Sequence, residues 1–384
     1  MTVPLGSMPA AAITFRQGAG LGIELIRLGE TGPGLVRVDI KATGVCHSDL
    51  HIVDGDWPTD RPLVLGHEAS GVVAEIGAGV RDVQVGDHVV LSWFAPCGRC
   101  VTCASGQAWL CSGTTAIDNT LPDGSTGFTD DDGLEVWPYL GLGTFTDSVL
   151  VPESAVIVVS DELPFEVGAL LGCSVTTGVG AVVNTASVPV GSVAVVIGCG
   201  GVGLSIIMGL KLVGANPIIA VDLSPEKLAI AEELGATVVL RGDEVDVPAH
   251  LQEHYGGADF AFEAIGRIAT IESLPSMLSA GGSAVLVGMT PVGARASIDP
   301  FDLADQGKSI LGCNYGSSVA KRDIPRLADL YLAGLLPLDK LIGLVRPLSD
   351  ASSALDELRA GVGLRSILVP AGREEELQVA RPTG

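Results

Sequence analysis

The segment VAVVIGCGGVGLSIIMGLKLVGANPIIAVD, residues 193–222, decides the fold of the second half of this chain. Val193–Ile197 predicts a buried strand, an apolar helical pattern runs through Val213, and Ile218–Val221 predicts a second strand that ends at Asp222. The turn between strand and helix has the pattern G-x-G-x-x-G, formed by Gly198, Cys199, Gly200, Gly201, Val202 and Gly203. Such a turn alone is common in a chain with 51 glycines. The strand before it, the helix after it and the acidic Asp222 beyond it predict a dinucleotide-binding βαβ unit.

The residues after Asp222 extend the same pattern. A helix is predicted at Glu226–Leu234, strands at Thr237–Leu240 and Ser283–Val287, and an apolar segment at Asp259–Ala264. Strands that alternate with helices predict a parallel, doubly wound sheet.

No charged residue occurs from Val167 to Leu210, so a hydropathy scan would propose a membrane span there. Pro189 and many glycines interrupt this stretch. We therefore interpret it as a helix, a turn and a buried strand.

Four cysteines with the spacing C-x2-C-x2-C-x7-C predict a tetrahedral zinc site on one loop: Cys97, Cys100, Cys103 and Cys111. Disulfides are the alternative, but nothing in the sequence indicates an oxidising compartment. Four protein ligands close such a site, so this zinc would be structural.

A second metal set is predicted from Cys46 in GVCHSDLH, His67 in LGHEASG and Cys173 in LLGCSVTTG. Each of these alone is more often a core residue. Together they offer two thiolates and one imidazole, which leaves a fourth position for water or substrate.

The motifs GVCHSDLH, GHEASGVV, CGRCVTCASGQAWLC, LGCSVTTGVG and GCGGVG occur in this order. In this the chain resembles the zinc-dependent alcohol dehydrogenases of the medium-chain dehydrogenase/reductase superfamily, over nearly its whole length. The resemblance implies an α/β protein with a β-rich GroES-like catalytic domain at residues 1–175, which carries the zinc lobe 95–113 and is completed by residues 316–384. It places an NAD-binding Rossmann domain, a doubly wound parallel sheet, at residues 176–315.

The resemblance also implies roles for residues near the catalytic metal. Cys46, His67 and Cys173 match its catalytic zinc ligands, so two zinc ions per chain are expected. Asp49 matches an aspartate that orients the histidine ligand. Glu68 matches a glutamate behind the zinc; the alternative is a structural carboxylate paired with a cation.

Ser48 and His51 match the relay that carries the proton of the alcohol to solvent, a task suited to imidazole. The alternative is that Ser48 caps a turn and His51 lies on the surface. Trp57 and Trp93 fall where the family lines its alcohol pocket, with core packing as the alternative.

Several matches concern the cofactor. Asp222 would bind the adenosine ribose and repel a 2′-phosphate, which favours NAD; the alternative is that it caps the following helix. Lys227 and Arg365 match a ribose-binding lysine and a pyrophosphate-binding arginine, with solvated surface charge as the alternative. Thr177 lies in a matching motif, and His47 stands where many members carry an arginine. Cys199 and Cys313 are interpreted as small buried hydrophobic residues.

Composition limits the partners. A net charge of −23 over 384 residues argues against nucleic acid or an anionic membrane surface. The sequence MTVPLGSMPAAAITF carries no basic stretch and no long apolar run, so we expect no signal peptide and a cytoplasmic protein. The polar tail from residue 372 to 384 is expected to fray.

The acidic segment Gly113–Gly143 resembles an insertion of the long form of these enzymes, which predicts a homodimer; a simple exposed loop is the alternative. Three functions remain open. They are an NAD-dependent dehydrogenase of primary or aromatic alcohols, a formaldehyde dehydrogenase acting on an S-hydroxymethyl thiol adduct, and a non-enzymatic NAD(H)-binding protein.

Overall fold

The computed structural model describes residues 8–370, which form two compact units. Unit 1 contains the described residues through Cys173, Val319–Gly334, and the described residues from Ile342 onward. Unit 2 contains Ser174–Ser318 and Leu335–Leu341. The last segment differs from the predicted division, which placed all of 316–384 with the catalytic domain.

Side chains of the segment Leu335–Leu341 explain why it lies with unit 2. Leu336, Leu338 and Leu341 are buried, and Lys340 Nζ lies 2.8 Å from a carboxylate oxygen of Glu233 in the same unit. Burial of three leucine side chains removes much apolar surface from water, and this stabilises the packed position of the segment.

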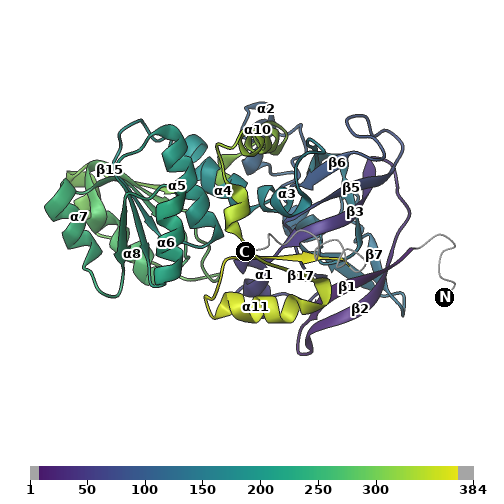
Figure 1. Ribbon diagram of the computed structural model, residues 1–384. Coiled ribbons are helices and arrows are strands. Elements are labelled where there is room, and N and C mark those ends of the chain that lie inside the picture. The colour runs from purple at the N-terminus through teal and green to yellow at the C-terminus, as the bar shows by residue number, and fades with distance from the viewer. Residues whose placement is uncertain (1–7, 371–384) are drawn as a thin grey trace, which may run out of the picture. The chain divides into compact units, whose positions relative to one another are not determined.

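Unit 2 is a six-stranded parallel sheet with helices on both faces (Figure 1). The strand order is β13-β12-β11-β14-β15-β16, and all neighbouring pairs are parallel. This is the doubly wound order in which the chain reverses direction at the first strand, next to the Gly-rich turn. The fold class predicted from the sequence is confirmed here.

The elements predicted in unit 2 begin and end within one residue of the predicted positions, except that β15 begins at Leu278 and not at Ser283. Its helices and strands are α4 Ser174–Gly180, β11 Ala194–Ile197, α5 Gly201–Val213, β12 Ile218–Asp222, α6 Pro225–Leu234, β13 Val238–Arg241, α7 Val247–Tyr255, β14 Ala258–Glu263, α8 Ile268–Met277, β15 Leu278–Leu286, α9 Pro300–Asp305 and β16 Ser309–Gly312.

Unit 1 is β-rich, as expected. Five strands close a barrel in the order β1-β2-β7-β8-β4, and a seven-stranded sheet has the order β10-β6-β5-β3-β18-β17, with β9 paired to β3. Its elements are β1 Met8–Arg16, β2 Gly20–Leu28, β3 Leu35–Gly44, α1 His47–Val53, β4 Leu63–Val64, β5 Ala69–Ile76, β6 His88–Leu91, α2 Val101–Ala104, β7 Phe128–Asp130, β8 Glu135–Pro138, β9 Ser148–Pro152, β10 Val156–Val158, α3 Phe165–Leu171, α10 Ala320–Leu332, β17 Ile342–Pro347, α11 Ala351–Arg359 and β18 Arg365–Val369.

The acidic segment Gly113–Gly143 is not a simple exposed loop, which corrects the alternative considered for it. It supplies β7 and β8, and without them the barrel would stay open. Phe128 and Val136 of these strands are buried in a core cluster with Ile26 and Leu28 of β2. Apolar positions between acidic turns therefore make this insertion part of the fold.

No single helix among residues 8–370 is long and apolar enough to cross a membrane, although Phe165–Leu171 and Ser174–Thr185 pass that test as a bent pair. Most of their apolar side chains are buried within the protein. Burial accounts for the uncharged stretch that begins at Val167. The frayed tail expected from residue 372 lies outside the described residues.

Candidate active site

The first site begins where β3 ends and α1 begins. Cys46 is the N-cap of α1, and its backbone N–H donates to Asp49 Oδ2 at 3.1 Å. The same carboxylate accepts the backbone N–H of Gly66 at 2.9 Å. Asp49 therefore joins the start of α1 to the loop that carries His67, and it is fully buried.

Asp49 also fixes the ring of His67. His67 Nδ1 lies 3.3 Å from Asp49 Oδ1, so the Nδ1 proton is donated to the carboxylate and Nε2 is left as the acceptor. His67 Nε2 is buried and has no hydrogen-bond partner. A buried imidazole nitrogen without a partner is costly, unless a metal ion takes its lone pair.

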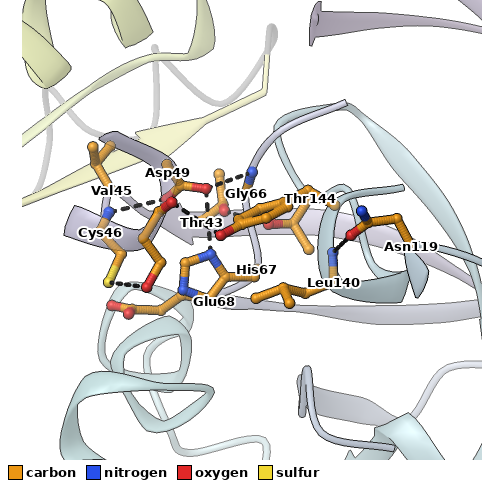
Figure 2. Close-up of polar contacts among 12 residues, drawn as sticks. Thr43, Val45, Cys46, Asp49, Gly66, His67, Glu68, Asn119, Leu140 and Thr144 are labelled. Atoms are coloured by element: carbon orange, nitrogen blue, oxygen red, sulfur yellow. Dashed lines mark hydrogen bonds and ion pairs between the residues drawn. The ribbon is translucent and has the colours of Figure 1, made fainter. Parts of the chain in front are cut away.

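His67 is one of four side chains that meet here (Figure 2 shows three of them). The ligand atoms of Cys46, His67, Glu68 and Cys173 all lie within 4.8 Å of one another. Cys46, His67 and Glu68 are buried, while Cys173 is partly exposed. Two sulfurs and one nitrogen at this spacing are a donor set that fits zinc.

The thiols of Cys46 and Cys173 shift each other's pKa in opposite directions. A hydrogen bond from Cys173 holds the pKa of the Cys46 thiol well below its ordinary value, against burial, and Arg365 acts in the same direction. The same hydrogen bond and burial raise the pKa of Cys173. A thiolate at Cys46 is the form that binds metal.

Arg365 is buried in contact with Val45 and Glu68 and is not on the surface, which corrects the alternative of a solvated charge. It is 7% exposed, its Nη1 donates to Val45 O at 2.7 Å, and its Nε lies 3.6 Å from Glu68 Oε1. Burial raises the pKa of Glu68 to about 7, and the positive charge of Arg365 opposes that rise. Glu68 is thus both a member of the cluster and the partner of a buried cation.

Helix α1 carries the two residues of the expected proton relay. Ser48 Oγ lies 4.0 Å from Cys46 Sγ, and the Ser48 carbonyl accepts a hydrogen bond from Tyr139 Oη at 2.9 Å. His51 is not a freely exposed side chain, because its Nδ1 lies 2.8 Å from Asp56 Oδ2. Its ring also stacks on Trp57 with a centroid distance of 4.7 Å.

Other expected site residues have different surroundings. His47 is exposed at the first position of α1. Trp57 packs against the core cluster that includes Leu50 and Phe145, whereas Trp93 packs against the cluster of the barrel and sheet. Within unit 1, the two tryptophans therefore belong to different core clusters.

The four-cysteine lobe is brought together as predicted. All eight cysteines are free, and the sulfurs of Cys97, Cys100, Cys103 and Cys111 lie within 4.8 Å of one another. Backbone N–H groups of Cys97 and Gly113 donate to Cys111 Sγ at 3.2 and 3.3 Å. The hydrogen bond to Thr102 lowers the pKa of Cys100 to about 5. Free thiols with donors directed at sulfur fit a metal better than disulfides.

The Gly-rich turn of unit 2 joins β11 to α5. A side chain at Gly203 would meet Gly198 O at 1.7 Å, so only glycine allows this helix to begin so close to the strand. At Gly200, the N-cap of α5, a Cβ would project into open space. An exposed backbone at a helix N-terminus is suited to a pyrophosphate.

Asp222 ends β12 beside this turn. Its carboxylate accepts the N–H of Cys199 at 2.7 Å and the N–H of Ser224 at 2.9 Å. Ser224, and not Asp222, is the N-cap of α6, since its side chain accepts from Lys227 N. Lys227 and Thr177 are both partly exposed within unit 2. Cys199 and Cys313 are buried, which confirms their interpretation as small interior residues.

Sequence reasoning missed three residues of the site: Asp56, Tyr139 and Asn119. Asp56 fixes His51, and Tyr139 packs edge-on against His67 with a centroid distance of 5.6 Å. The side chain of Asn119 accepts a hydrogen bond from the backbone N–H of Leu140, the residue after Tyr139. Only Asp56, five positions from His51, left a local signal in the sequence; Asn119 and Tyr139 lie 68 and 88 positions after His51.

Two thiol-rich clusters and a Gly-rich nucleotide turn on a doubly wound sheet define a zinc-dependent, nucleotide-binding dehydrogenase. Residues 32–161 match the family model described as alcohol dehydrogenase GroES-like domain, and residues 201–333 match the one described as zinc-binding dehydrogenase. The chain belongs to the zinc-dependent alcohol dehydrogenases of the medium-chain dehydrogenase/reductase superfamily. It is therefore an enzyme that uses zinc and NAD and acts on small alcohols or aldehydes.

Individual relatives cover nearly the whole chain. An alcohol dehydrogenase class-3 of Cereibacter sphaeroides is 37% identical, with 91% of this chain and 97% of the relative covered. An S-(hydroxymethyl)glutathione dehydrogenase of Paracoccus denitrificans is 36% identical with the same coverage. The crystal structure of benzyl alcohol dehydrogenase from Acinetobacter calcoaceticus is similar with a TM-score of 0.87 and 33% identity, covering 95% of this chain and 100% of that one.

Proposed function

We propose that this protein oxidises primary or aromatic alcohols with NAD, and reduces the corresponding aldehydes, at a zinc ion held by Cys46, His67 and Cys173. The observation that carries the proposal is the buried His67 Nε2, which has no hydrogen-bond partner, on a ring whose ligand nitrogen lies within 4.8 Å of both sulfurs. A zinc ion bound there would lower the pKa of an alcohol hydroxyl, and NAD would accept the hydride. The lobe of Cys97, Cys100, Cys103 and Cys111 would hold the second, structural zinc.

The protein's own residues would prepare this chemistry. Asp49 holds the His67 ring in the tautomer that offers Nε2 to a metal. The positive charge of Arg365 stabilises the Cys46 thiolate. Arg365 also pairs with the Glu68 carboxylate, which holds Glu68 near the cluster and leaves the two sulfurs as ligands. Ser48 would accept a hydrogen bond from the alcohol hydroxyl and pass its proton toward His51, whose ring is oriented by Asp56.

A second function is supported by the names of two relatives. Both the class-3 enzyme and the S-(hydroxymethyl)glutathione dehydrogenase favour a thiol-dependent formaldehyde dehydrogenase. The benzyl alcohol dehydrogenase of similar structure favours the aromatic alcohol instead. The same zinc chemistry serves both, so only the substrate distinguishes them.

The test is NADH formation at 340 nm with purified, zinc-loaded protein, using benzyl alcohol, ethanol, and formaldehyde with and without glutathione. We expect turnover of benzyl alcohol without any thiol. NADH formation from formaldehyde only in the presence of glutathione, together with no turnover of benzyl alcohol, would replace our proposal by the second function.

Further parts of the proposal concern organisation. We infer that unit 1 is the catalytic domain and unit 2 the NAD-binding domain, with Gly198, Gly200, Gly201, Val202, Gly203, Asp222, Lys227, Thr177, His47 and Arg365 serving the cofactor. We also propose a cytoplasmic homodimer. A mass equal to four chains in sedimentation equilibrium would rule the dimer out.

A prediction follows for His51. Replacing His51 by Gln slows alcohol oxidation about tenfold at neutral pH, the low end of general-base effects, because water partly replaces the relay. The rate recovers at higher pH, where hydroxide removes the proton directly. The pH profile of kcat measures this. A profile identical to that of the wild type would show that the proton leaves by another route.

Cofactor choice gives another prediction. Asp222→Gly removes the charge that would face a 2′-phosphate, so the ratio of kcat/KM for NADP to that for NAD rises by roughly tenfold or more. Because Asp222 also accepts the N–H of Cys199 and Ser224, Asp222→Asn is the matched variant that keeps an acceptor there. A wild type that prefers NADP would contradict the assigned role of Asp222.

A further inference from the structure

The acidic segment Gly113–Gly143 contains two residues with unusual backbone conformations next to Tyr139, whose ring contacts His67. Leu140 has φ 51° and ψ 33°, and Asn119 has φ 57° and ψ 42°. Both are left-handed, a region that asparagine tolerates and that leucine rarely adopts. A strained leucine near a site is held there by its surroundings.

The restraint on Leu140 is the side chain of Asn119. Leu140 N donates to Asn119 Oδ1 at 2.7 Å, across 21 positions of sequence (Figure 2). The turn that presents Asn119 is closed by its own bonds, since Thr115 Oγ1 donates to Thr120 O at 2.9 Å and Asn119 N donates to Ala116 O at 3.0 Å. Asn119 is therefore a fixed acceptor.

The residues next to this bond form one wall of the site. Tyr139 packs edge-on against His67 and donates to the carbonyl of Ser48. Leu140 directly follows Tyr139 and packs on the same core cluster, so it adjoins the residue whose ring contacts His67. Leu140 is half-buried, with part of it packed on the core cluster of Tyr139 and Phe145 and part left accessible.

We propose that Asn119 is a positioning residue for substrate choice: its hydrogen bond to Leu140 N holds the Leu140 side chain next to Tyr139, whose ring contacts His67, as an apolar wall for the carbon group of the alcohol. A fixed apolar wall binds a large ring better than a two-carbon chain, because it removes more apolar surface from water. The wall therefore favours benzyl alcohol over ethanol. This inference rests on the proposed function.

The decisive variant is Asn119→Gly, which tolerates the left-handed backbone at position 119 and removes only the acceptor. Asn119→Asp is the matched control, since it keeps an acceptor oxygen and also tolerates this backbone. Leu140→Ala and the double variant Asn119→Gly/Leu140→Ala test whether Asn119 acts through the Leu140 side chain.

We expect Asn119→Gly to lower kcat/KM for benzyl alcohol about tenfold, through a higher KM. A change of this size is what the loss of one apolar contact in a pocket produces. The kcat for ethanol should stay within about twofold of the wild-type value. Asn119→Asp retains the wild-type ratio of benzyl alcohol to ethanol. The double variant has the same kcat/KM for benzyl alcohol as Leu140→Ala alone. Zinc content stays at the wild-type value in all variants.

Binding of benzamide and acetamide, unreactive analogues of the two aldehydes, is measured in parallel by calorimetry with NADH present. This measurement reports on the wall even if the protein oxidises neither alcohol, so a failure of the proposed function is distinguishable from a failure of this inference. Equal benzamide affinity in the wild type and Asn119→Gly overturns the inference. An equal loss in Asn119→Gly and Asn119→Asp also overturns it.

Discussion

Replacing Cys46 by Ser lowers alcohol turnover by about three orders of magnitude or more, because bound zinc supplies several kcal/mol of charge stabilisation to the alkoxide. The zinc content falls from two ions per chain to one. A serine hydroxyl is far less acidic than a cysteine thiol, so it does not replace the thiolate ligand. Metal analysis and the rate of NADH formation measure the two effects.

The fold is expected to survive this substitution. The backbone N–H of Cys46 still donates to Asp49, and Asp49 still joins α1 to Gly66. Cys313→Ser is the matched control, since Cys313 is buried in unit 2 outside both clusters. That control should keep two zinc ions and full activity. An active Cys46→Ser protein would show that the zinc is held elsewhere.

Local sequence patterns predicted the parts of this protein that local chemistry determines. The turn at Gly198–Gly203 needs glycine at Gly203 for steric reasons, so the strand, turn and helix could be predicted from one segment. The four-cysteine lobe was likewise predictable, since its ligands lie within 15 consecutive residues, from Cys97 to Cys111. The cluster of Cys46, His67 and Cys173 was proposed from three separate motifs, and the family resemblance supported it, because these residues are far apart in sequence.

Other features depend on contacts that no local pattern encodes. The hydrogen bond from Leu140 to Asn119 joins two turns inside an acidic segment that resembles a loop in composition. Arg365 is separated from Val45, whose carbonyl it binds, by 320 positions. A charged residue in the apolar strand LRSILV is ordinarily exposed, so its burial against Glu68 follows only from the tertiary structure.

The lobe of Cys97, Cys100, Cys103 and Cys111 is expected to depend on its metal for structure. Of its four cysteines only Cys111 is buried. Val101 is 85% exposed and Leu110 is 50% exposed, so the lobe has little hydrophobic core of its own. Without a core, the free energy of metal binding is what orders such a segment.

Cys103→Ser should therefore remove one zinc ion and lower Tm by roughly 10 °C, a few kcal/mol for a domain of this size. Arg99 lies exposed between Cys97 and Cys100, so trypsin should cleave after it in the variant and not in the wild type. Ser105→Ala is the control, because this exposed hydroxyl donates only within the lobe, to Thr102 O. If Cys103→Ser keeps two zinc ions and the wild-type Tm, the lobe is not a zinc site, and hydrogen bonds to its sulfurs, such as those from Cys97 N and Gly113 N to Cys111 Sγ, must hold it together.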